Sequence, residues 1–176
     1  LFAPVVSSEE QWPFERAHRF IVETFSTFSD KLASFADRAF KNDWIDALPR
    51  EGKVGGAYCI SFPLPKESRV LSNYNHNFSS VSTVAHELGH AYHHEVLKDH
   101  SAVHRDYPMT LAETASIFCQ NLVIGEMLEN AAGPSRLGIL EEFLQEGTQV
   151  IVDILSRFLF EQSLFKKREQ AELSPE

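Results

Sequence analysis

Residues 81–94 read VSTVAHELGHAYHH, and this stretch decides both the fold and the chemistry open to the chain. It contains the pattern H-E-x-x-H at His86, Glu87 and His90, on a segment that we expect to be helical. Residues four apart lie about 6 Å from each other on one helix face, so two imidazoles can occupy adjacent corners of a tetrahedral metal site. The glutamate between them would lie beside the open corner, where a carboxylate can take a proton from a metal-bound water.

Two simpler explanations compete with a metal site. The chain contains 8 histidines, and chance alone produces such a five-residue pattern in roughly a few per cent of chains of this composition. The histidines could also belong to a solvated helix face. The apolar neighbours Val81, Val84 and Leu88 argue against both, because they predict a buried helix in which two unpartnered histidines would be costly.

A third ligand is available in the segment LAETAS at residues 111–116, where Glu113 follows His90 by 23 residues. One helix-loop-helix reversal could return this carboxylate to the metal. His93 is a competing ligand, but it lies about 10.5 Å along the helix axis from His86, which suits tetrahedral geometry poorly. We therefore prefer Glu113 as the third ligand and expect His93 to lie beside the metal or toward the substrate.

The remaining sequence predicts a mainly α fold with a small β hairpin or sheet near residues 55–74. Helices are expected over residues 8–28, 31–40, 81–98, 109–130 and 135–170, and short strands over 57–62 and 69–73. Ser7 or Ser8 would cap the first helix, and its phenylalanine stripe to Phe28 is typical of a core face. His94, His100 and His104 are expected at the surface. With no linker visible, residues 1–176 are expected to form a single domain.

Composition excludes several function classes. The formal net charge of −9 and the pI near 5.4 argue against nucleic acid as a partner. Cys59 and Cys119 form no C-x-x-C pair, which indicates a reducing compartment. No apolar run approaches the roughly 20 residues of a membrane span, and the Leu1 end is unlike a secretory signal. We therefore expect a cytoplasmic protein, and the start without Met suggests a cut end.

The motifs HELGHAYH (residues 86–93) and LAETAS (residues 111–116) resemble the thimet oligopeptidase and oligoendopeptidase F family of zinc metallopeptidases. The segment GKVGGAYC (residues 52–59) is similar to the family's glycine-rich stretch before its small sheet. Trp44-Ile45-Asp46 and the helices before it also resemble oligoendopeptidase F. The resemblance covers essentially the whole chain and is specific around residues 81–120. It implies a fragment of a larger, mostly helical, zincin-like peptidase domain.

The resemblance also implies an activity and a set of roles. The family cleaves short peptides in a deep channel; His86, His90 and Glu113 match its zinc ligands, and Glu87 matches its catalytic base. Gly56, Ala57 and Tyr58 match the region where an extended peptide could pair with an edge strand, although an ordinary tight turn entering a strand explains these three residues equally well.

Two departures from the family pattern stand out. Gln120 occupies the position of a family glutamate seven residues after the ligand glutamate. No histidine follows His104 and no tyrosine follows Tyr107, although the family supplies such donors to the tetrahedral intermediate from a downstream segment. Losing one donor costs about 3 kcal/mol of transition-state stabilisation. We therefore expect the 176-residue chain to bind zinc but to be a weak or inactive peptidase by itself.

The function predicted from the sequence is zinc-dependent endopeptidase activity on short peptides, through a metal-bound water activated by Glu87. Two alternatives stay open: another metal-dependent hydrolase, and a non-catalytic helical domain with a structural metal site. The sequence does not predict the peptide specificity, the native metal or the oligomeric state.

Overall fold

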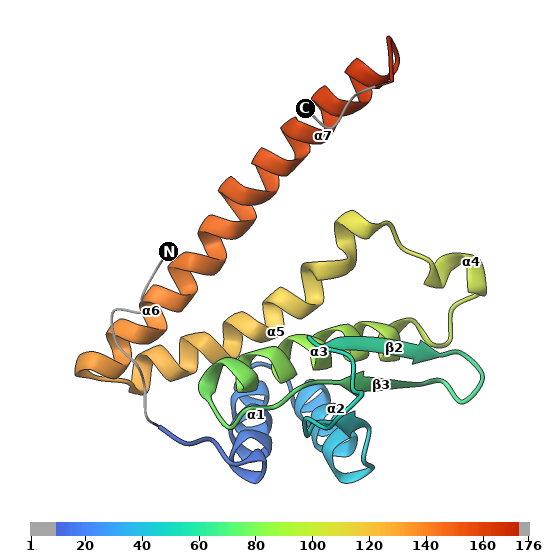
Figure 1. Cartoon of the computed structure of the whole chain (residues 1–176). Helices are drawn as coiled ribbons and strands as arrows, with labels where there is room; N and C mark the ends of the chain where they lie inside the picture. Colours follow the sequence, from blue (N-terminus) through green and yellow to red (C-terminus); the bar gives the residue numbers. More distant parts are fainter. Residues whose placement is uncertain (1–9, 173–176) are drawn as a thin grey trace. The chain divides into compact units, whose positions relative to one another are not determined.

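The computed structural model describes residues 10–172, which form a mainly helical fold with one small sheet (Figure 1). The elements are α1 (Phe14–Phe28), α2 (Asp30–Lys41), β1 (Ile45–Asp46), β2 (Tyr58–Phe62), β3 (Glu67–Leu71), α3 (Phe78–Leu97), α4 (Ala102–Arg105), α5 (Met109–Asn130), α6 (Gly133–Thr148), the π-helical turn η1 (Gln149–Asp153) and α7 (Ile154–Arg168). The predicted fold class is confirmed. Within residues 10–172, no helix combines the length and the apolar character that a bilayer crossing requires.

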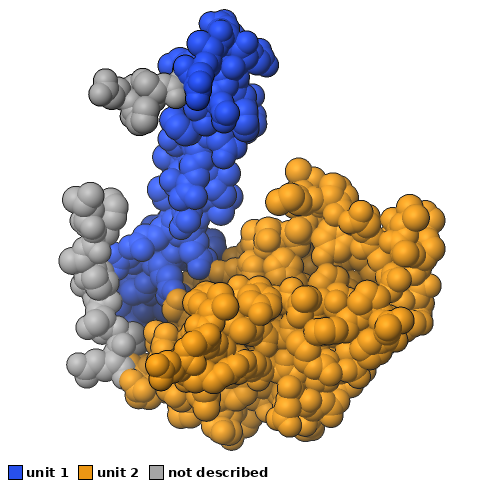
Figure 2. Space-filling model, turned by 45° about the vertical axis from the view of Figure 1, so that its right-hand side comes forward, with its two compact units in different colours: residues 1–8, 131–176 blue, residues 9–130 orange. Residues whose placement is uncertain are grey.

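The described residues divide into two compact units (Figure 2). Residues 10–130 form one unit, with the sheet and the helices that carry both metal-binding motifs. Residues 131–172 belong to the other unit and form α6, η1 and α7, in which Ile139 is the buried residue and most apolar side chains are exposed. The expectation that residues 1–176 make a single domain stays a prediction.

The first helix begins later than the sequence suggests. α1 starts at Phe14 instead of Ser8, because Pro13 disfavours helical backbone at the residue before it. The N–H of Trp12 instead donates to the carbonyl of His76, at 2.8 Å. The predicted caps Ser7 and Ser8 lie outside the described residues.

The first two helices pack their apolar faces together beneath α3. Ile21, Phe25, Phe35 and Leu88 are buried in this core, as the spacing of the apolar residues predicts. Phe28 departs from the predicted core stripe: it is 60% exposed at the end of α1, where its ring meets Phe118 with the ring centroids 4.8 Å apart.

The sheet has the strand order β1-β3-β2, which leaves β2 at one edge. β1 runs parallel to β3, and β2 runs antiparallel to it with Tyr58 opposite Leu71. β3 ends at Leu71 instead of Asn73, and beyond it the Tyr74 N–H donates to the Ala47 carbonyl at 2.8 Å. The two-residue strand β1 and the short helix α4 were not predicted.

The helix α3 lies between the sheet and α5 and contacts both (Figure 1). Its first turn is capped by Asn77, whose Oδ1 accepts from the Ser80 N–H at 2.9 Å. The crossing with α5 is unusually close at Gly89. A Cβ at this position would lie 2.6 Å from the Ala115 carbonyl oxygen and 2.6 Å from the Ser116 Cα. Glycine therefore permits the backbone of α5 to approach between the two histidines.

Candidate metal centre

Three side chains from α3 and α5 converge on one point. His86 Nε2 lies 3.1 Å from Glu113 Oε2, and His90 Nε2 lies 3.3 Å from the same oxygen. One ligand atom from each of the three residues lies within 4.8 Å of the others. The two imidazole centroids are 5.0 Å apart, with the rings inclined at 80°. The structure thus brings together the three residues that the sequence predicts as ligands.

Both imidazoles are oriented by partners on α5. His86 Nδ1 lies 2.8 Å from Gln120 Oε1, an oxygen that can only accept, so this nitrogen carries the proton. The Nε2 lone pair of His86 is therefore directed to Glu113. His90 is held by a hydrogen bond to the backbone of Ala112. Hydrogen bonds of this kind fix the tautomer and the ring direction of metal-binding histidines.

Glu113 is held in place by Ser116, one turn further along α5. The Ser116 hydroxyl is fully buried and donates to Glu113 Oε2 at 2.7 Å. Partial burial alone would raise the pKa of Glu113, but the Ser116 hydrogen bond and the two neighbouring imidazoles together hold that pKa below its usual value. Burial lowers the pKa of His90, which favours the neutral ring that a metal needs.

Glu87 is 6% exposed and lies beside this cluster on α3. Burial and the nearby Glu113 carboxylate raise its pKa, although the His86 ring acts in the opposite direction. Its Oε2 has no hydrogen-bond partner among the described residues. A buried carboxylate oxygen without a partner is costly, so its environment suits a group that receives a proton from a bound molecule.

The arrangement fits a zinc ion. Zn–N distances of about 2.0–2.1 Å place the ligand atoms of a tetrahedral site about 3.3 Å apart. The two measured distances to Glu113 Oε2, 3.1 and 3.3 Å, agree with this spacing. Two imidazoles and one carboxylate are the donor set that catalytic zinc sites use when a fourth position stays open. The unpartnered oxygen of Glu87 lies on the same helix, between the two histidines in sequence.

A cleft of about 590 Å³ lies next to His86 and Glu87. Gly56, Ala57 and Gln120 also line it, together with asparagine and serine side chains around the start of α3. Tyr58, which was also predicted to bind substrate, is not among the lining residues; it begins β2 and is 46% exposed. Gly56 and Ala57, two of the four residues predicted to bind substrate, thus line the cleft that also contains His86 and Glu87.

His93 lies outside the three-residue cluster and packs against the segment that joins α3 to α5. Its ring stacks on Tyr107 at a centroid distance of 4.3 Å, and its buried Nδ1 has no hydrogen-bond partner in the described part of the chain. The Tyr107 hydroxyl lies 3.1 Å from His94 Nε2. His94 is thus half-buried, whereas the sequence suggested a surface position at the helix end.

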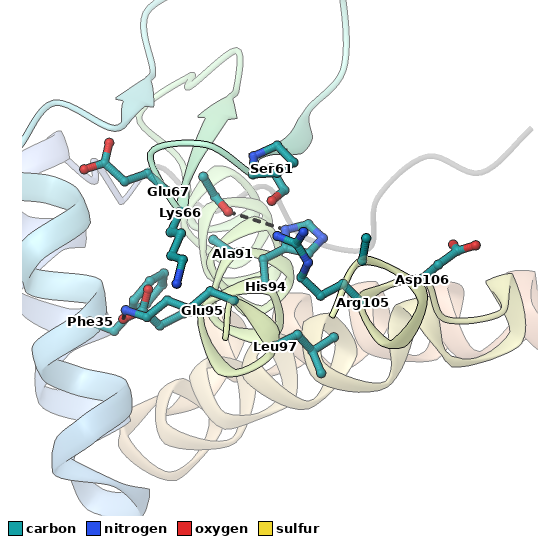
Figure 3. A pocket seen from close by; sticks show the side chains of 14 residues that line it. Phe35, Ser61, Lys66, Glu67, Ala91, His94, Glu95, Leu97, Arg105 and Asp106 are labelled. Atoms are coloured by element: carbon teal, nitrogen blue, oxygen red, sulfur yellow. Dashed lines mark hydrogen bonds and ion pairs between the residues drawn. The ribbon is translucent and has the colours of Figure 1, made fainter. Parts of the chain in front are cut away.

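A second cavity, of about 320 Å³, lies near the C-terminal end of α3 and contains none of the three cluster residues (Figure 3). His94 extends into it and contacts Ser68 of β3, with Nδ1 and Oγ 3.4 Å apart. Lys66, Arg105 and Glu67 also line it, so both signs of charge are present. This mixture indicates no particular ligand.

Sequence reasoning missed the contributions of Ser116 and Ala112 to the cluster. Both residues flank Glu113 within the motif LAETAS, so their proximity to the ligand was visible. Their contacts with Glu113 and His90 depend on the rotation of α5 against α3, which spacing alone does not define. Gln120 was expected to be able to hydrogen-bond near the ligands without bringing a charge, and in the structure its partner is His86 Nδ1.

Comparison with known proteins agrees with the geometry. Residues 15–172 match the family description Peptidase family M3. The chain is 28% identical over 181 residues to oligopeptidase PepF of Bacillus subtilis (strain 168), covering 100% of this chain and 27% of the relative. It is 26% identical over 172 residues to an oligoendopeptidase F homolog of Lactococcus lactis subsp. lactis (strain IL1403), covering 97% and 27% of the two chains.

A solved structure from Chlamydophila abortus, described as a peptidase, superposes with a TM-score of 0.77 and 25% identity. The match covers 93% of this chain and 28% of that one. The chain thus spans only about 27% of the length of the curated relatives that it matches. The family consists of zinc metallopeptidases. The match across residues 15–172, together with the His86, His90 and Glu113 cluster, shows that the chain belongs to peptidase family M3.

Proposed function

We propose that the chain is the zinc-binding part of an oligopeptidase that hydrolyses peptide bonds in short peptides. His86, His90 and Glu113 would hold the zinc ion, and Glu87 would act as the catalytic base. The observation that carries this proposal is the convergence of two imidazole nitrogens and one carboxylate oxygen beside a buried carboxylate whose Oε2 lacks a partner. The names of the oligopeptidase relatives support short peptides as the substrate class.

When bound, the zinc ion would polarise the substrate carbonyl and lower the pKa of a coordinated water. Glu87 would accept a proton from the attacking water on its carboxylate and return that proton to the leaving amine. Its raised pKa suits both steps, because a base that must later act as an acid works best with a pKa near the working pH. Gln120 and Ser116 would keep His86 and Glu113 directed at the ion.

The open edge of β2 supports a peptide-binding role through its main chain. Val70 of β3 and Ser72, directly after β3, donate their N–H groups toward the β1 side, to the carbonyls of Trp44 and Asp46. The main-chain groups of alternate residues point to opposite edges of a strand, so those of Arg69 and Leu71 face β2. Their partners Ile60 and Tyr58 point back toward β3.

It follows that Ala57, Cys59 and Ser61 direct their N–H and C=O groups to the open edge. Ala57 also lines the cleft beside Glu87. We therefore propose that Ala57 hydrogen-bonds the substrate main chain. Gly56 would contribute by allowing close approach, Tyr58 by its exposed ring, and His93 by the substrate-facing place of its ring, which stacks on Tyr107. Localisation in the cytoplasm remains part of the proposal.

The test compares wild type with Glu87→Gln, and with Glu129→Gln as a control of the same chemistry on an exposed part of α5. Zinc affinity is measured by calorimetry, and single-turnover hydrolysis of an internally quenched short peptide is followed at high protein concentration. Glu87→Gln should retain zinc affinity and lose at least about 100-fold in hydrolysis rate. Glu129→Gln should match wild type in both.

The outcome separates the competing functions. Equal hydrolysis by Glu87→Gln and wild type would refute Glu87 as the base. Hydrolysis of an ester panel in preference to peptides would favour another metal-dependent hydrolase. Zinc bound by four protein ligands without turnover would favour a structural metal site, because such sites leave no open position.

A further inference from the structure

The antiparallel ladder between β2 and β3 stops just before the cleft. Its last pair is Tyr58 and Leu71, which exchange main-chain hydrogen bonds, so the next hydrogen-bonded pair in the same register, two residues further along each strand, would be Gly56 and Asn73. Gly56 has a φ of +80°, a left-handed conformation that takes the backbone out of the extended form. The main-chain ladder therefore cannot continue to the residues that line the cleft.

Beyond Tyr58, the side chain of Asn73 makes hydrogen bonds to this segment in place of the β3 main chain. Its Nδ2 donates to the Gly56 carbonyl at 2.9 Å and to the Val54 carbonyl at 2.9 Å. Both neighbours are acceptors, so only the amide nitrogen can face them. Asn73 thus supplies the two donors that strand β3 would otherwise provide from its backbone.

The other end of the glycine-rich segment is anchored independently. The Lys53 side chain is 1% exposed, and its Nζ donates to the carbonyls of Asp46 and Leu48, each at 2.9 Å. Between Lys53 and Tyr58, the side-chain hydrogen bonds that the structure describes to the backbone all come from Asn73. The position of Gly56 and Ala57 relative to His86 and Glu87 therefore depends on one amide group.

We propose that Asn73 is a positioning residue that holds residues 54–57 as an extension of the β2 edge, so that Ala57 presents its main chain to a peptide. By binding the inward-facing carbonyls of Val54 and Gly56, Asn73 sets which backbone groups face the cleft. This inference rests on the proposed function, since it assigns a role in binding the same substrate. Asn73 does not contact the metal cluster through any described hydrogen bond.

The test uses the full 176-residue chain with zinc bound. Asn73→Ala removes the donors, and Asn73→Asp keeps the shape but places a second oxygen opposite the two carbonyls. Asn121→Ala serves as the control, because Asn121 is exposed on α5 and lines neither cavity described above. Each variant is also combined with Glu87→Gln, so that a fluorescein-labelled hexapeptide can bind without being cleaved.

Three quantities are measured: hydrogen exchange of the amides of residues 54–58, zinc affinity, and hexapeptide affinity by fluorescence anisotropy. Both Asn73 variants should exchange these amides faster and bind the peptide about tenfold more weakly, as expected for two lost hydrogen bonds that are only partly coupled to binding. Zinc affinity should stay unchanged. A purely structural defect would instead lower zinc affinity and the melting temperature together.

If the amides of residues 54–58 exchange at the wild-type rate in both Asn73 variants, the proposal that Asn73 holds residues 54–57 in place is overturned. Faster exchange with undiminished peptide affinity would overturn the link to substrate. If the chain with intact Asn73 and the Asn121→Ala control bind zinc but no peptide, the peptide-binding part of the proposed function fails as well. That outcome is distinct from a failure of the Asn73 proposal, because peptide binding would then be absent whether or not Asn73 is intact.

Discussion

Gly89→Ala tests whether the close crossing of α3 and α5 builds the metal cluster. The added methyl group would lie 2.6 Å from the Ala115 carbonyl oxygen and 2.6 Å from the Ser116 Cα. Both are backbone atoms of α5, so no side-chain rotation can relieve the overlap. The helices must move apart at the position where Ser116 orients Glu113.

The required movement is about 0.8 Å, the difference between 2.6 Å and the 3.4 Å at which ordinary contact begins. Metal sites tolerate deviations of about 0.2 Å in ligand distance. A shift of this size would draw Glu113 away from His86 and His90, so zinc affinity should fall at least about tenfold, comparable to the loss of an orienting partner. Overpacking costs about 1–3 kcal/mol of folding stability, and the better helix propensity of alanine offsets about 1 kcal/mol of it.

Gly125→Ala provides the matched control, because it makes the same change within α5 where no atom lies within 4 Å of the new Cβ. This control should gain up to about 1 kcal/mol of stability and keep wild-type zinc affinity. Calorimetric zinc titration and urea unfolding of the metal-free proteins measure both effects. The reasoning is refuted if Gly89→Ala binds zinc as tightly as wild type and is stabilised like Gly125→Ala.

Two further predictions concern the orientation and the protonation of the cluster. Gln120→Leu removes the acceptor for His86 Nδ1 and should weaken zinc binding about 10- to 100-fold. Gln120→Glu keeps an acceptor and should bind zinc at least as tightly as wild type. Equal affinity of wild type and both variants in a zinc titration would contradict this prediction. Burial lowers the pKa of His90 and His94, so the unfolded chain binds more protons than the folded chain near pH 6, and metal-free stability should fall as the pH drops from 7 toward 5. Burial lowers the pKa of His93 as well, and the raised pKa of Glu87 opposes this trend with one group against three histidines. Urea unfolding in EDTA that shows higher stability at pH 5 than at pH 7 would contradict the prediction.

Local signals predicted most of the helices. Ser29 caps α2 through its side chain, and Pro108 precedes α5, so both boundaries were readable from the sequence. The start of α1 was not, because a helical spacing of apolar residues extends through Trp12 although Pro13 and a long-range hydrogen bond exclude that residue from the helix. The π-helical turn at residues 149–153 also left no clear signal in the spacing of apolar residues.

The candidate ligands were predictable because their spacing reflects the geometry of one helix and one reversal. Their orientation was not predictable, since the contacts of Gln120 and Ser116 depend on how closely Gly89 lets the two helices approach. The bond from Asn73 to Gly56 depends on the hairpin register, and the predicted strand over residues 69–73 placed Asn73 within the ladder instead of beyond its end. These contacts depend on the packing of α3 against α5 and on the register of the hairpin, neither of which can be derived from the sequence alone.

The central claim is that His86, His90 and Glu113 bind one zinc ion, and the most direct measurement is a zinc titration of Glu113→Ala against wild type. Glu129→Ala, an exposed glutamate on the same helix, is the control. Wild type and the control should each bind one zinc ion, and Glu113→Ala should lose more than about 100-fold in affinity, since the loss of even an orienting partner costs about 10- to 100-fold. Equal zinc affinity of all three proteins, or no zinc binding by wild type, would contradict the account.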